Sequence, residues 1–234
     1  MTKPKTTIRR LPERGVDDRV VINAILDEGF LCHVGYLKDN LPVVIPTLYV
    51  RDGDRIILHG STASGIARAV QRHSPLSITV TLIDGLVIAR SAFHSSANYR
   101  SVVIHGFGKI LHGEEHRRAL DITLRSLIPG REDDVRTSTD AEMRQTASIE
   151  VPLTEVSAKV RSGPPGDDPQ DLENLSVWGG VVPLTLSAGA PIPDEHVAPG
   201  TKLPDYLNPY ERYGVDERRV DGDYQIGRGR NGTG

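Results

Sequence analysis

The residues with the clearest potential for chemistry lie together in His59-Gly60-Ser61-Thr62-Ala63-Ser64-Gly65. This segment follows a β-branched run and precedes a short helical pattern, so it lies where a strand leads into a helix. Backbone N–H groups at a helix start can surround a phosphate together with hydroxyl groups, and glycine lets the backbone approach closely. The alternative is an ordinary N-cap, because serine and threonine cap helices without any ligand. The GxxxxGK[ST] pattern of a P-loop is absent.

A second candidate lies in Asn98-Tyr99-Arg100-Ser101, at the start of a long apolar run. The guanidinium of Arg100 could pair with a phosphate through two parallel hydrogen bonds. A solvated arginine at the end of a strand is the alternative. The residues alone do not separate these two interpretations.

Several histidines could suggest a metal site. His33, His59 and His105 fall on separate expected strands, while His112 and His116 are spaced i, i+4 across the boundary between a strand and a helix. No HExxH pattern and no cysteine–histidine cluster accompanies them in the sequence. We therefore predict no metal site. The nucleophile-elbow pattern GxSxG is missing as well.

Trp178 is the only tryptophan of the chain and precedes Gly179-Gly180. A single tryptophan usually belongs to the core. Next to two glycines, its ring could instead lie against a planar ligand. Both interpretations stay open at this stage.

Strands and helices must position these groups, and their limits follow from periodicity and capping. A first helix is expected to begin at Asp17 or Asp18, either of which can cap it, and to end at Gly29 in the manner of a C′ glycine. Polar turns between β-branched runs predict antiparallel strands. The expected strands cover residues 30–37, 43–50, 55–59, 76–82, 99–111, 147–151 and 177–186, and further helices cover residues 66–72, 114–127 and 140–146.

The predicted fold class is mainly β (α+β). About seven short strands with two or three helices fit a closed barrel better than a parallel sheet. Pro46 lies inside the second strand and lacks an N–H, so that strand needs an edge or a bulge there. From residue 162 onward the chain holds 9 of its 16 prolines and 12 of its 23 glycines, which favours extended or irregular structure.

Composition bounds the class of protein. The 234 residues, 38% of them hydrophobic and 25% charged, can bury a core. A net charge of −3 gives no electrostatic reason to expect nucleic acid or an anionic membrane as a partner. No apolar run approaches the ~20 residues that span a bilayer. Cys32 is the only cysteine, which excludes an intramolecular disulfide, and we expect a reducing, cytoplasmic location.

Several blocks, taken together, resemble a known family. The blocks are Leu26-Asp27-Glu28-Gly29, His33-Val34-Gly35, Pro42-Val43-Val44-Ile45-Pro46-Thr47, Leu58-His59-Gly60-Ser61-Thr62-Ala63, Ser91-Ala92-Phe93-His94, Asn98-Tyr99-Arg100-Ser101-Val102-Val103, Ser157-Ala158-Lys159-Val160-Arg161 and Trp178-Gly179-Gly180-Val181-Val182-Pro183-Leu184. In this order they resemble the flavin mononucleotide (FMN)-binding split-barrel proteins related to pyridoxamine 5′-phosphate oxidase, within them the nitroimidazole-resistance branch. The resemblance covers residues 8–203.

This resemblance implies a six-stranded antiparallel split β-barrel with flanking helices, and a homodimer with one FMN in each of two clefts between the subunits. The strand over residues 42–47 is expected to present backbone groups to the isoalloxazine edge, and residues 59–64 to hold the ribityl phosphate. The position of Arg100 also approaches the cofactor. The implied cofactor-binding residues are Val44, Ile45, Pro46, Thr47, His59, Gly60, Ser61, Thr62, Ser64, Tyr99, Arg100, Ser101 and Trp178.

The expected function is that of an FMN-dependent oxidoreductase. Hydride would arrive from NAD(P)H and leave to a small acceptor such as a nitroaromatic, a quinone or oxygen. In the nitroimidazole-resistance branch a histidine at the position of His59 lies near flavin and substrate, and its pKa suits proton transfer near neutrality. The alternatives are a flavin- or haem-binding protein for sensing or storage, since relatives also host haem or deazaflavin, and a catalytically silent dimeric scaffold.

Pyridoxamine 5′-phosphate oxidase-like activity is a further alternative, and one departure from the family counts against it. Those oxidases end in a basic Arg-x-His segment that binds the substrate phosphate. Here residues 187–203 contain one lysine and are rich in proline, alanine and glycine.

Two segments are expected along the chain, a barrel with an N-terminal helix and a C-terminal extension over residues 1–203, and an acidic, partly disordered tail over residues 204–234. Residues 1–162 carry 22 basic against 19 acidic side chains, whereas residues 163–234 carry 6 against 12. Tyr206, Tyr210 and Tyr213 suggest that residues 204–215 dock onto the barrel or onto a partner chain. Residues 221–234 are expected to be dispensable for folding.

Overall fold

The computed structural model describes residues 8–173, 176–207 and 210, and the chain divides into two compact units, Met1–Ser187 and Ala188–Gly234. The strands are β1 (Gly15–Val16), β2 (Leu31–Lys38), β3 (Leu41–Asp52), β4 (Arg55–Ser61), β5 (Pro75–Ile88), β6 (Ser96–Phe107), β7 (Lys109–Ile110), β8 (Thr146–Pro152), β9 (Glu155–Arg161) and β10 (Gly180–Pro183). The helices are α1 (Arg19–Glu28), α2 (Gly65–Gln71), α3 (Gly113–Leu127) and α4 (Asp140–Gln145), with short 3-10 turns η1 (Pro12–Arg14), η2 (Arg131–Asp133) and η3 (Asp171–Glu173).

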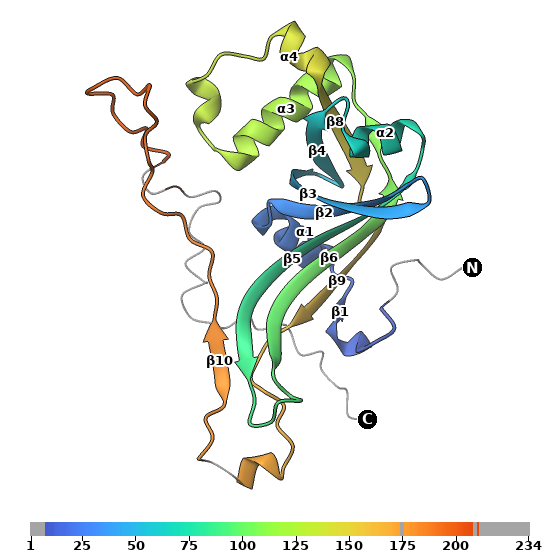
Figure 1. The fold of residues 1–234 in the computed structure, drawn as a ribbon, viewed down its shortest axis with the longest axis vertical. Coiled ribbons are helices and arrows are strands. Elements are labelled where there is room, and N and C mark those ends of the chain that lie inside the picture. Colours follow the sequence, from blue (N-terminus) through green and yellow to red (C-terminus); the bar gives the residue numbers. More distant parts are fainter. Residues whose placement is uncertain (1–7, 174–175, 208–209, 211–234) are drawn as a thin grey trace, which may run out of the picture. The chain divides into compact units, whose positions relative to one another are not determined.

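The strands of the first unit pair in the order β1-β9-β6-β5-β2-β3-β4-β8-β7, and β10 pairs with the far end of β5 (Figure 1). Strands β6 and β7 are one stretch of chain interrupted at Gly108, so the sheet returns to this stretch after β5, β2, β3, β4 and β8. A Cβ at Gly108 would lie 2.9 Å from side-chain atoms of both Val70 and Ile149, so glycine lets the chain turn this corner. The predicted six-stranded antiparallel split barrel with flanking helices is confirmed.

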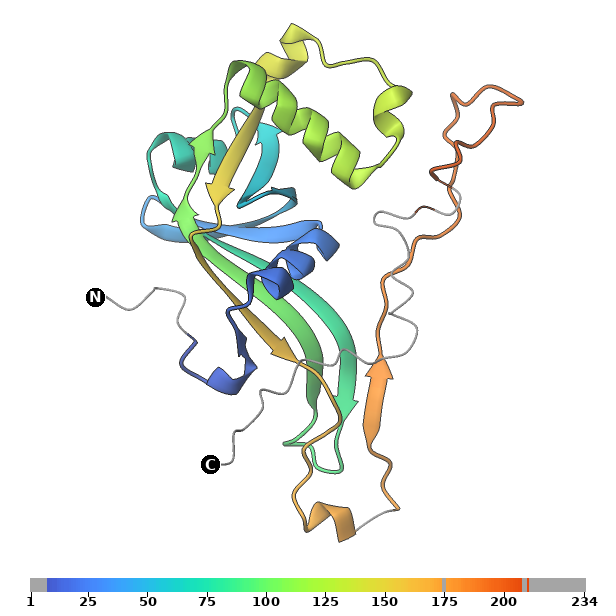
Figure 2. The same cartoon turned by 180° about the vertical axis from the view of Figure 1, so that it is seen from behind.

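Side chains that alternate along the strands fill the barrel. In β5, Leu76, Ile78 and Val80 are buried, whereas the residues between them are half-buried or exposed. Ile25 and Leu26 of α1 join the same core, and this helix lies across β3, β5 and β6 (Figure 2). Burying each such side chain stabilises the fold by about 1.5–3 kcal/mol, which is why α1 docks here.

Helix α1 begins and ends where the sequence predicted, but Gly29 does not take the expected conformation. Asp18 is the N-cap, and its carboxylate accepts the N–H of Val20 at 2.8 Å. The expected role of Gly29 as a left-handed C′ glycine is wrong, because its φ of −70° is extended. Glycine is needed there for space, since a Cβ would lie 2.6 Å from the Tyr49 hydroxyl oxygen. That hydroxyl donates to the carbonyl of Leu26 at 2.8 Å.

Several predicted strands are present with different limits. Strand β5 continues well beyond residue 82, because an irregularity between Ile83 and Gly85 absorbs a segment that resembles a turn. Strand β9 was not predicted, since small and charged residues alternate along it without a strong apolar signal. The strand expected over residues 177–186 contracts to β10.

Helix α3 covers the outer face of β3 and β4 (Figure 1). Its Ala119 packs with Val50, Ile57 and Leu111 in a second, smaller apolar cluster. The residues on either side of Ile57, Ile56 and Leu58, belong to the barrel core. Strand β4 is therefore buried on both faces.

The described residues of the second unit form turns and an isolated bridge between Leu207 and Tyr210. Residues 208–209 and 211–234 lie outside the described residues, and so do Tyr213 and the segment expected to be dispensable. The predicted boundary at residue 203, the docking of residues 204–215 and the disorder of the tail stay predictions. In the described part of the chain, no helix combines the length and the apolar character needed to cross a membrane.

Candidate functional site

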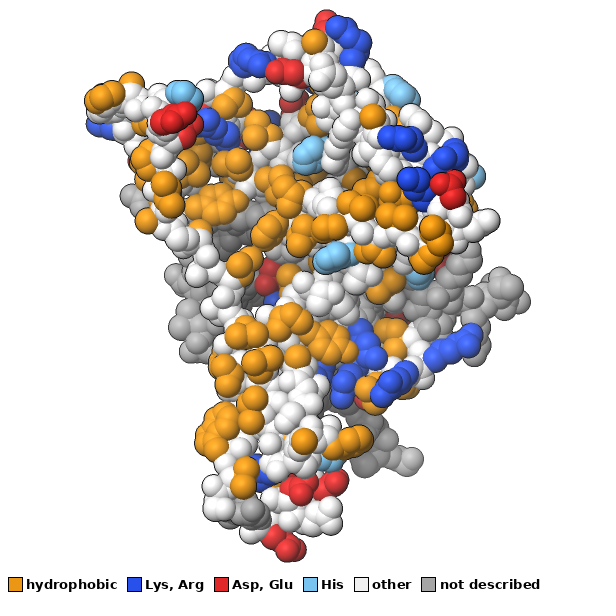
Figure 3. All heavy atoms as spheres, in the orientation of Figure 1, with side chains coloured by type: hydrophobic (Ala, Val, Ile, Leu, Met, Phe, Trp, Pro, Cys, Tyr) orange, Lys and Arg blue, Asp and Glu red, His pale blue; other side chains and the backbone are white. Residues whose placement is uncertain are grey.

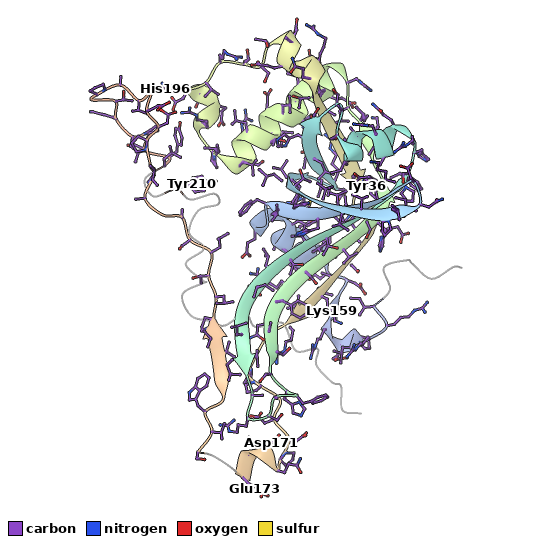
Figure 4. The ribbon with its side chains drawn as sticks, viewed as in Figure 1. Tyr36, Lys159, Asp171, Glu173, His196 and Tyr210 are labelled. Carbon is purple, nitrogen blue, oxygen red and sulfur yellow. The ribbon has the colours of Figure 1, made fainter. Side chains whose placement is uncertain are left out.

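A small hollow of about 130 Å³ lies between β3, the end of β4, the start of α2 and β8. It is lined by Ile45, Pro46, Thr47, Leu58, His59, Gly60, Ser64, Ile66, Ala147 and Ile149. Two segments that the sequence singled out, residues 45–47 and residues 59–64, therefore meet here. Tyr36, labelled in Figure 4, lies beside this place, because a Cβ at Gly65 would be 2.0 Å from its hydroxyl oxygen.

The first part of β3, which lines the hollow, has a paired strand on one side only in the described part of the chain. Residues 41–48 of β3 pair with β2, whereas β4 pairs only with residues 49–52. Pro46, which lies opposite His33 of β2, therefore falls where a missing N–H breaks no ladder to β4, as the sequence predicted. Val44, Ile45 and Pro46 are exposed, so this edge is accessible to a ligand.

His59 is the titratable group of the hollow. It lies at the end of β4, opposite Ser148 of β8 in the ladder. Its Nδ1 atom is buried and has no hydrogen-bond partner within the described residues. Burial lowers the pKa of His59, because it disfavours the charged imidazolium. The side chain is therefore neutral at neutral pH and keeps an unused polar atom.

A buried network supports the strand opposite His59. Ser148 is fully buried, and its Oγ lies 2.8 Å from Nδ1 of His116 on α3. The other ring nitrogen of His116, Nε2, lies 3.2 Å from the carbonyl oxygen of Met143. Because a carbonyl can only accept, Nε2 carries a proton, and in the neutral imidazole Nδ1 then accepts the hydrogen bond of the serine hydroxyl. These two hydrogen bonds of His116 connect α3 and α4 to β8, the strand that contains Ser148.

The hydroxyl-rich loop between β4 and α2 is held by its own hydrogen bonds. Ser64 is the N-cap of α2, and its Oγ accepts the N–H of Ala67 at 3.1 Å. The N–H of Ala63 donates to Oγ of Ser61 at 3.2 Å, and the N–H of Thr62 donates to the carbonyl of Gln145 at 3.0 Å. The capping interpretation is thus correct for Ser64. Within the described residues, the hydroxyl protons of Ser61, Thr62 and Ser64 have no acceptor, and phosphate binding by this loop stays a prediction.

Arg100 is held by carboxylates and does not line the hollow. Its guanidinium donates to Asp84 at 2.9 and 2.6 Å and to Glu28 at 2.9 Å, with a further contact between Nη1 and Glu28. Burial alone would lower the pKa of Arg100, but the hydrogen bonds to Asp84 and Glu28 outweigh it and raise the pKa. A phosphate that binds Arg100 in this structure would have to displace a carboxylate.

The remaining predicted residues lie elsewhere on the first unit. Tyr99 and Ser101 flank Arg100 on β6, opposite Ile83 and Thr81 of β5. Trp178 is 63% exposed, so the core interpretation of this tryptophan is wrong. Val44, Ser61 and Thr62 adjoin the lining residues in the chain without lining the hollow themselves.

Sequence reasoning missed the groups that act through long-range contacts. Glu28 and Asp84 carried no motif that linked them to Arg100, from which they are 72 and 16 residues distant. His116 was considered only as a possible metal ligand, and Ser148 not at all. A buried serine and histidine on facing elements leave no signal in sequence spacing.

A family model and several solved structures match this chain. A family model described as pyridoxamine 5′-phosphate oxidase matches residues 18–160. The solved structure of the flavocytochrome Anf3 from Azotobacter vinelandii is 35% identical, with a TM-score of 0.83, and the match covers 88% of this chain and 96% of that one. For a FAD and heme binding protein from Mycobacterium smegmatis the identity is 35%, the TM-score 0.81 and the coverage 84% and 96%.

A candidate 5-nitroimidazole antibiotic resistance protein from Bacteroides thetaiotaomicron is 25% identical, with a TM-score of 0.52, and the match covers 62% of this chain and 86% of that one. The comparison with curated proteins found no match.

Proposed function

Because the chain belongs to the pyridoxamine 5′-phosphate oxidase family, we propose that it binds a flavin and uses it to oxidise or reduce a small organic molecule. Two relatives at 35% identity support a flavin, since one is named a flavocytochrome and the other a FAD and heme binding protein. The candidate nitroimidazole resistance protein supports a small acceptor of the nitroaromatic kind.

The observation that carries the proposal is the unused polar atom of His59 in the hollow. A buried donor or acceptor without a partner costs about 1–3 kcal/mol, and proteins rarely retain one without a reason. Nδ1 of His59 is such an atom, in a side chain that lines the hollow beside the β3 edge. A flat ligand with polar groups along one edge would meet the backbone of the β3 edge and would contact the His59 side chain that lines the hollow. The residues present therefore fit a flavin.

The chain's own groups have separate tasks in this proposal. The β3 edge at residues 44–47 orients the ring, and the hydroxyl groups of Ser61, Thr62 and Ser64 bind the ribityl phosphate. His59, neutral at neutral pH, would hold the ring or the substrate from its place at the hollow and would be the group that can take up or give a proton there. When bound, the flavin supplies the electron chemistry, and the protein supplies orientation and electrostatics.

One chain covers too little of such a ligand, which supports a homodimer. Ligand sites usually enclose about 300–1,000 Å³, whereas this hollow measures about 130 Å³. Hydrophobic side chains gather over β2 and β3 (Figure 3), and they include the exposed Leu31, Val44 and Leu48. We propose that a second copy covers this face and completes the site. A monomer that retains flavin at low micromolar concentration in sedimentation would contradict the dimer.

The flavin can be FMN or FAD. The sequence blocks resemble FMN proteins, whereas one relative at 35% identity is named a FAD and heme binding protein. Chromatography of the flavin released by heat or acid from the purified protein identifies the form. NADH and NADPH are the proposed electron donors, and their oxidation by the purified protein, with a nitroaromatic or a quinone as acceptor, measures the activity.

A flavin protein that also carries haem is a second candidate. Of the two relatives at 35% identity, one is named a flavocytochrome and the other a FAD and heme binding protein. Such a protein would transfer electrons or sense a redox signal. The visible spectrum of the purified protein separates the candidates. The paired near-ultraviolet and blue bands of an oxidised flavin support the first proposal, an added Soret band supports the second, and the absence of both bands after reconstitution with flavin overturns them.

A further inference from the structure

One histidine and two aspartates converge at the tip of the ribbon formed by β5 and β6. His94 belongs to the connection between these strands, and Asp168 and Asp171 belong to the segment after β9. Nε2 of His94 lies 3.1 Å from Oδ2 of Asp168, and one ligand atom from each of the three residues lies within 4.8 Å of the others. Figure 4 shows Asp171 at the far end of the ribbon from Tyr36, which lies beside the hollow.

The local charges leave these two aspartates without a cation. The carboxylate of the neighbouring Asp167 accepts two hydrogen bonds from Arg90, one from the backbone N–H and one from Nη1, both at 2.8 Å. Within the described residues, no lysine or arginine forms an ion pair with Asp168 or Asp171. Two carboxylates thus approach one imidazole. The excess negative charge favours a bound cation.

The spacing suits a single metal ion. Bonds of about 2.1 Å from nitrogen and oxygen ligands place neighbouring ligand atoms about 3 Å apart and opposite ones about 4.2 Å apart. The 3.1 Å between His94 Nε2 and Asp168 Oδ2 falls in this range, and the ligand atom of Asp171 lies within 4.8 Å of both. An imidazole nitrogen with two carboxylates suits zinc and other first-row divalent ions, whereas calcium and magnesium take oxygen ligands.

We propose that His94, Asp168 and Asp171 bind a first-row divalent cation such as Zn²⁺. The sequence predicted no metal site, and the block that contains His94 was given no role. The ion fixes the segment over residues 162–173 to the tip of the ribbon. This segment leads the chain back to β10, so the metal holds the turn that returns the chain to β5. The inference does not depend on a flavin.

Zinc titration of the full-length protein tests the site. The protein is first treated with a chelator, which is then removed. Calorimetry with Zn²⁺ is expected to show one strong binding site per chain, formed by His94, Asp168 and Asp171. His94→Ala and Asp171→Asn are each expected to weaken binding at this site at least about tenfold, the scale of losses at metal sites when supporting groups are removed. His196→Ala is the matched control, since His196 is exposed and lies 3.6 Å from a single carboxylate, that of Glu195. It is expected to leave the affinity unchanged.

Two further readouts keep the proposal falsifiable if the alanine variant folds poorly. Asp171→Asn keeps the size of the side chain, and circular dichroism checks its fold. X-ray absorption of the zinc-loaded protein is expected to show nitrogen and oxygen ligands that include one imidazole, and zinc is expected to raise Tm in the wild type but not in Asp171→Asn. The absence of stoichiometric zinc binding, or equal affinity in the wild type, His94→Ala and Asp171→Asn, would overturn the site.

Discussion

Replacing Arg100 by methionine removes the cation that two carboxylates share. The Arg100 side chain is 18% exposed, and the side chains of its partners Glu28 and Asp84 are 25% and 34% exposed. Removing one partner of a fully buried ion pair costs about 3–5 kcal/mol, and exposed pairs contribute about 0–1 kcal/mol. Water reaches this cluster in part, so we expect the free energy of unfolding to fall by about 2–3 kcal/mol. At a slope of about 2 kcal/mol/M the urea midpoint falls by about 1–1.5 M.

Urea unfolding and flavin titration together test this reasoning. Arg125→Met is the matched control, because Arg125 is 64% exposed and pairs with Glu132 at 2.9 Å at the surface, and its loss is expected to cost no more than about 1 kcal/mol. Adding Glu28→Gln and Asp84→Asn to Arg100→Met should recover part of the loss, since no unpaired charge remains. FMN and riboflavin should be affected alike. An unchanged midpoint with a selective loss of FMN affinity would refute this account and assign Arg100 to the phosphate.

Three further substitutions test the hollow and its support. Gly65→Ala is expected to destabilise the fold by about 1–3 kcal/mol, because its Cβ would lie 2.0 Å from the Tyr36 hydroxyl oxygen, and urea unfolding should show a smaller loss in a Tyr36→Phe background. Ser148→Ala leaves Nδ1 of His116 without its donor and is expected to cost about 1–3 kcal/mol in the same assay. The lowered pKa of His59 means that the folded state resists protonation, so His59 contributes stability above pH 6.5 that is lost as the pH falls below it. His59→Gln should therefore lose less stability than the wild type between pH 7.5 and pH 5.5, and parallel losses would contradict this.

Local signals predicted the elements, and long-range partners escaped prediction. Capping by Asp18 and the alternation of Leu76, Ile78 and Val80 depend on neighbours in the chain. Residue type at the helix start predicted the first, and periodicity predicted the second. The partners of Arg100 depend on which distant residues the barrel brings together. A guanidinium binds a carboxylate and a phosphate with the same donors, and only the fold shows that two carboxylates occupy it. The family resemblance located the segments of the hollow, because several blocks in order constrain a fold more strongly than one motif.

The same distinction bears on the flavin phosphate. The loop over residues 61–64 is ordered by hydrogen bonds: Oγ of Ser64 accepts the N–H of Ala67, and the N–H of Thr62 donates to the carbonyl of Gln145 in α4. A preformed loop loses little conformational entropy when a ligand binds. In the proposed complex, the rotating hydroxyl protons of this loop would meet the terminal phosphate of FMN and the corresponding phosphate of FAD equally well. The choice between the two flavins would then depend on the groups that cover the hollow, which in the proposed dimer come from the second chain.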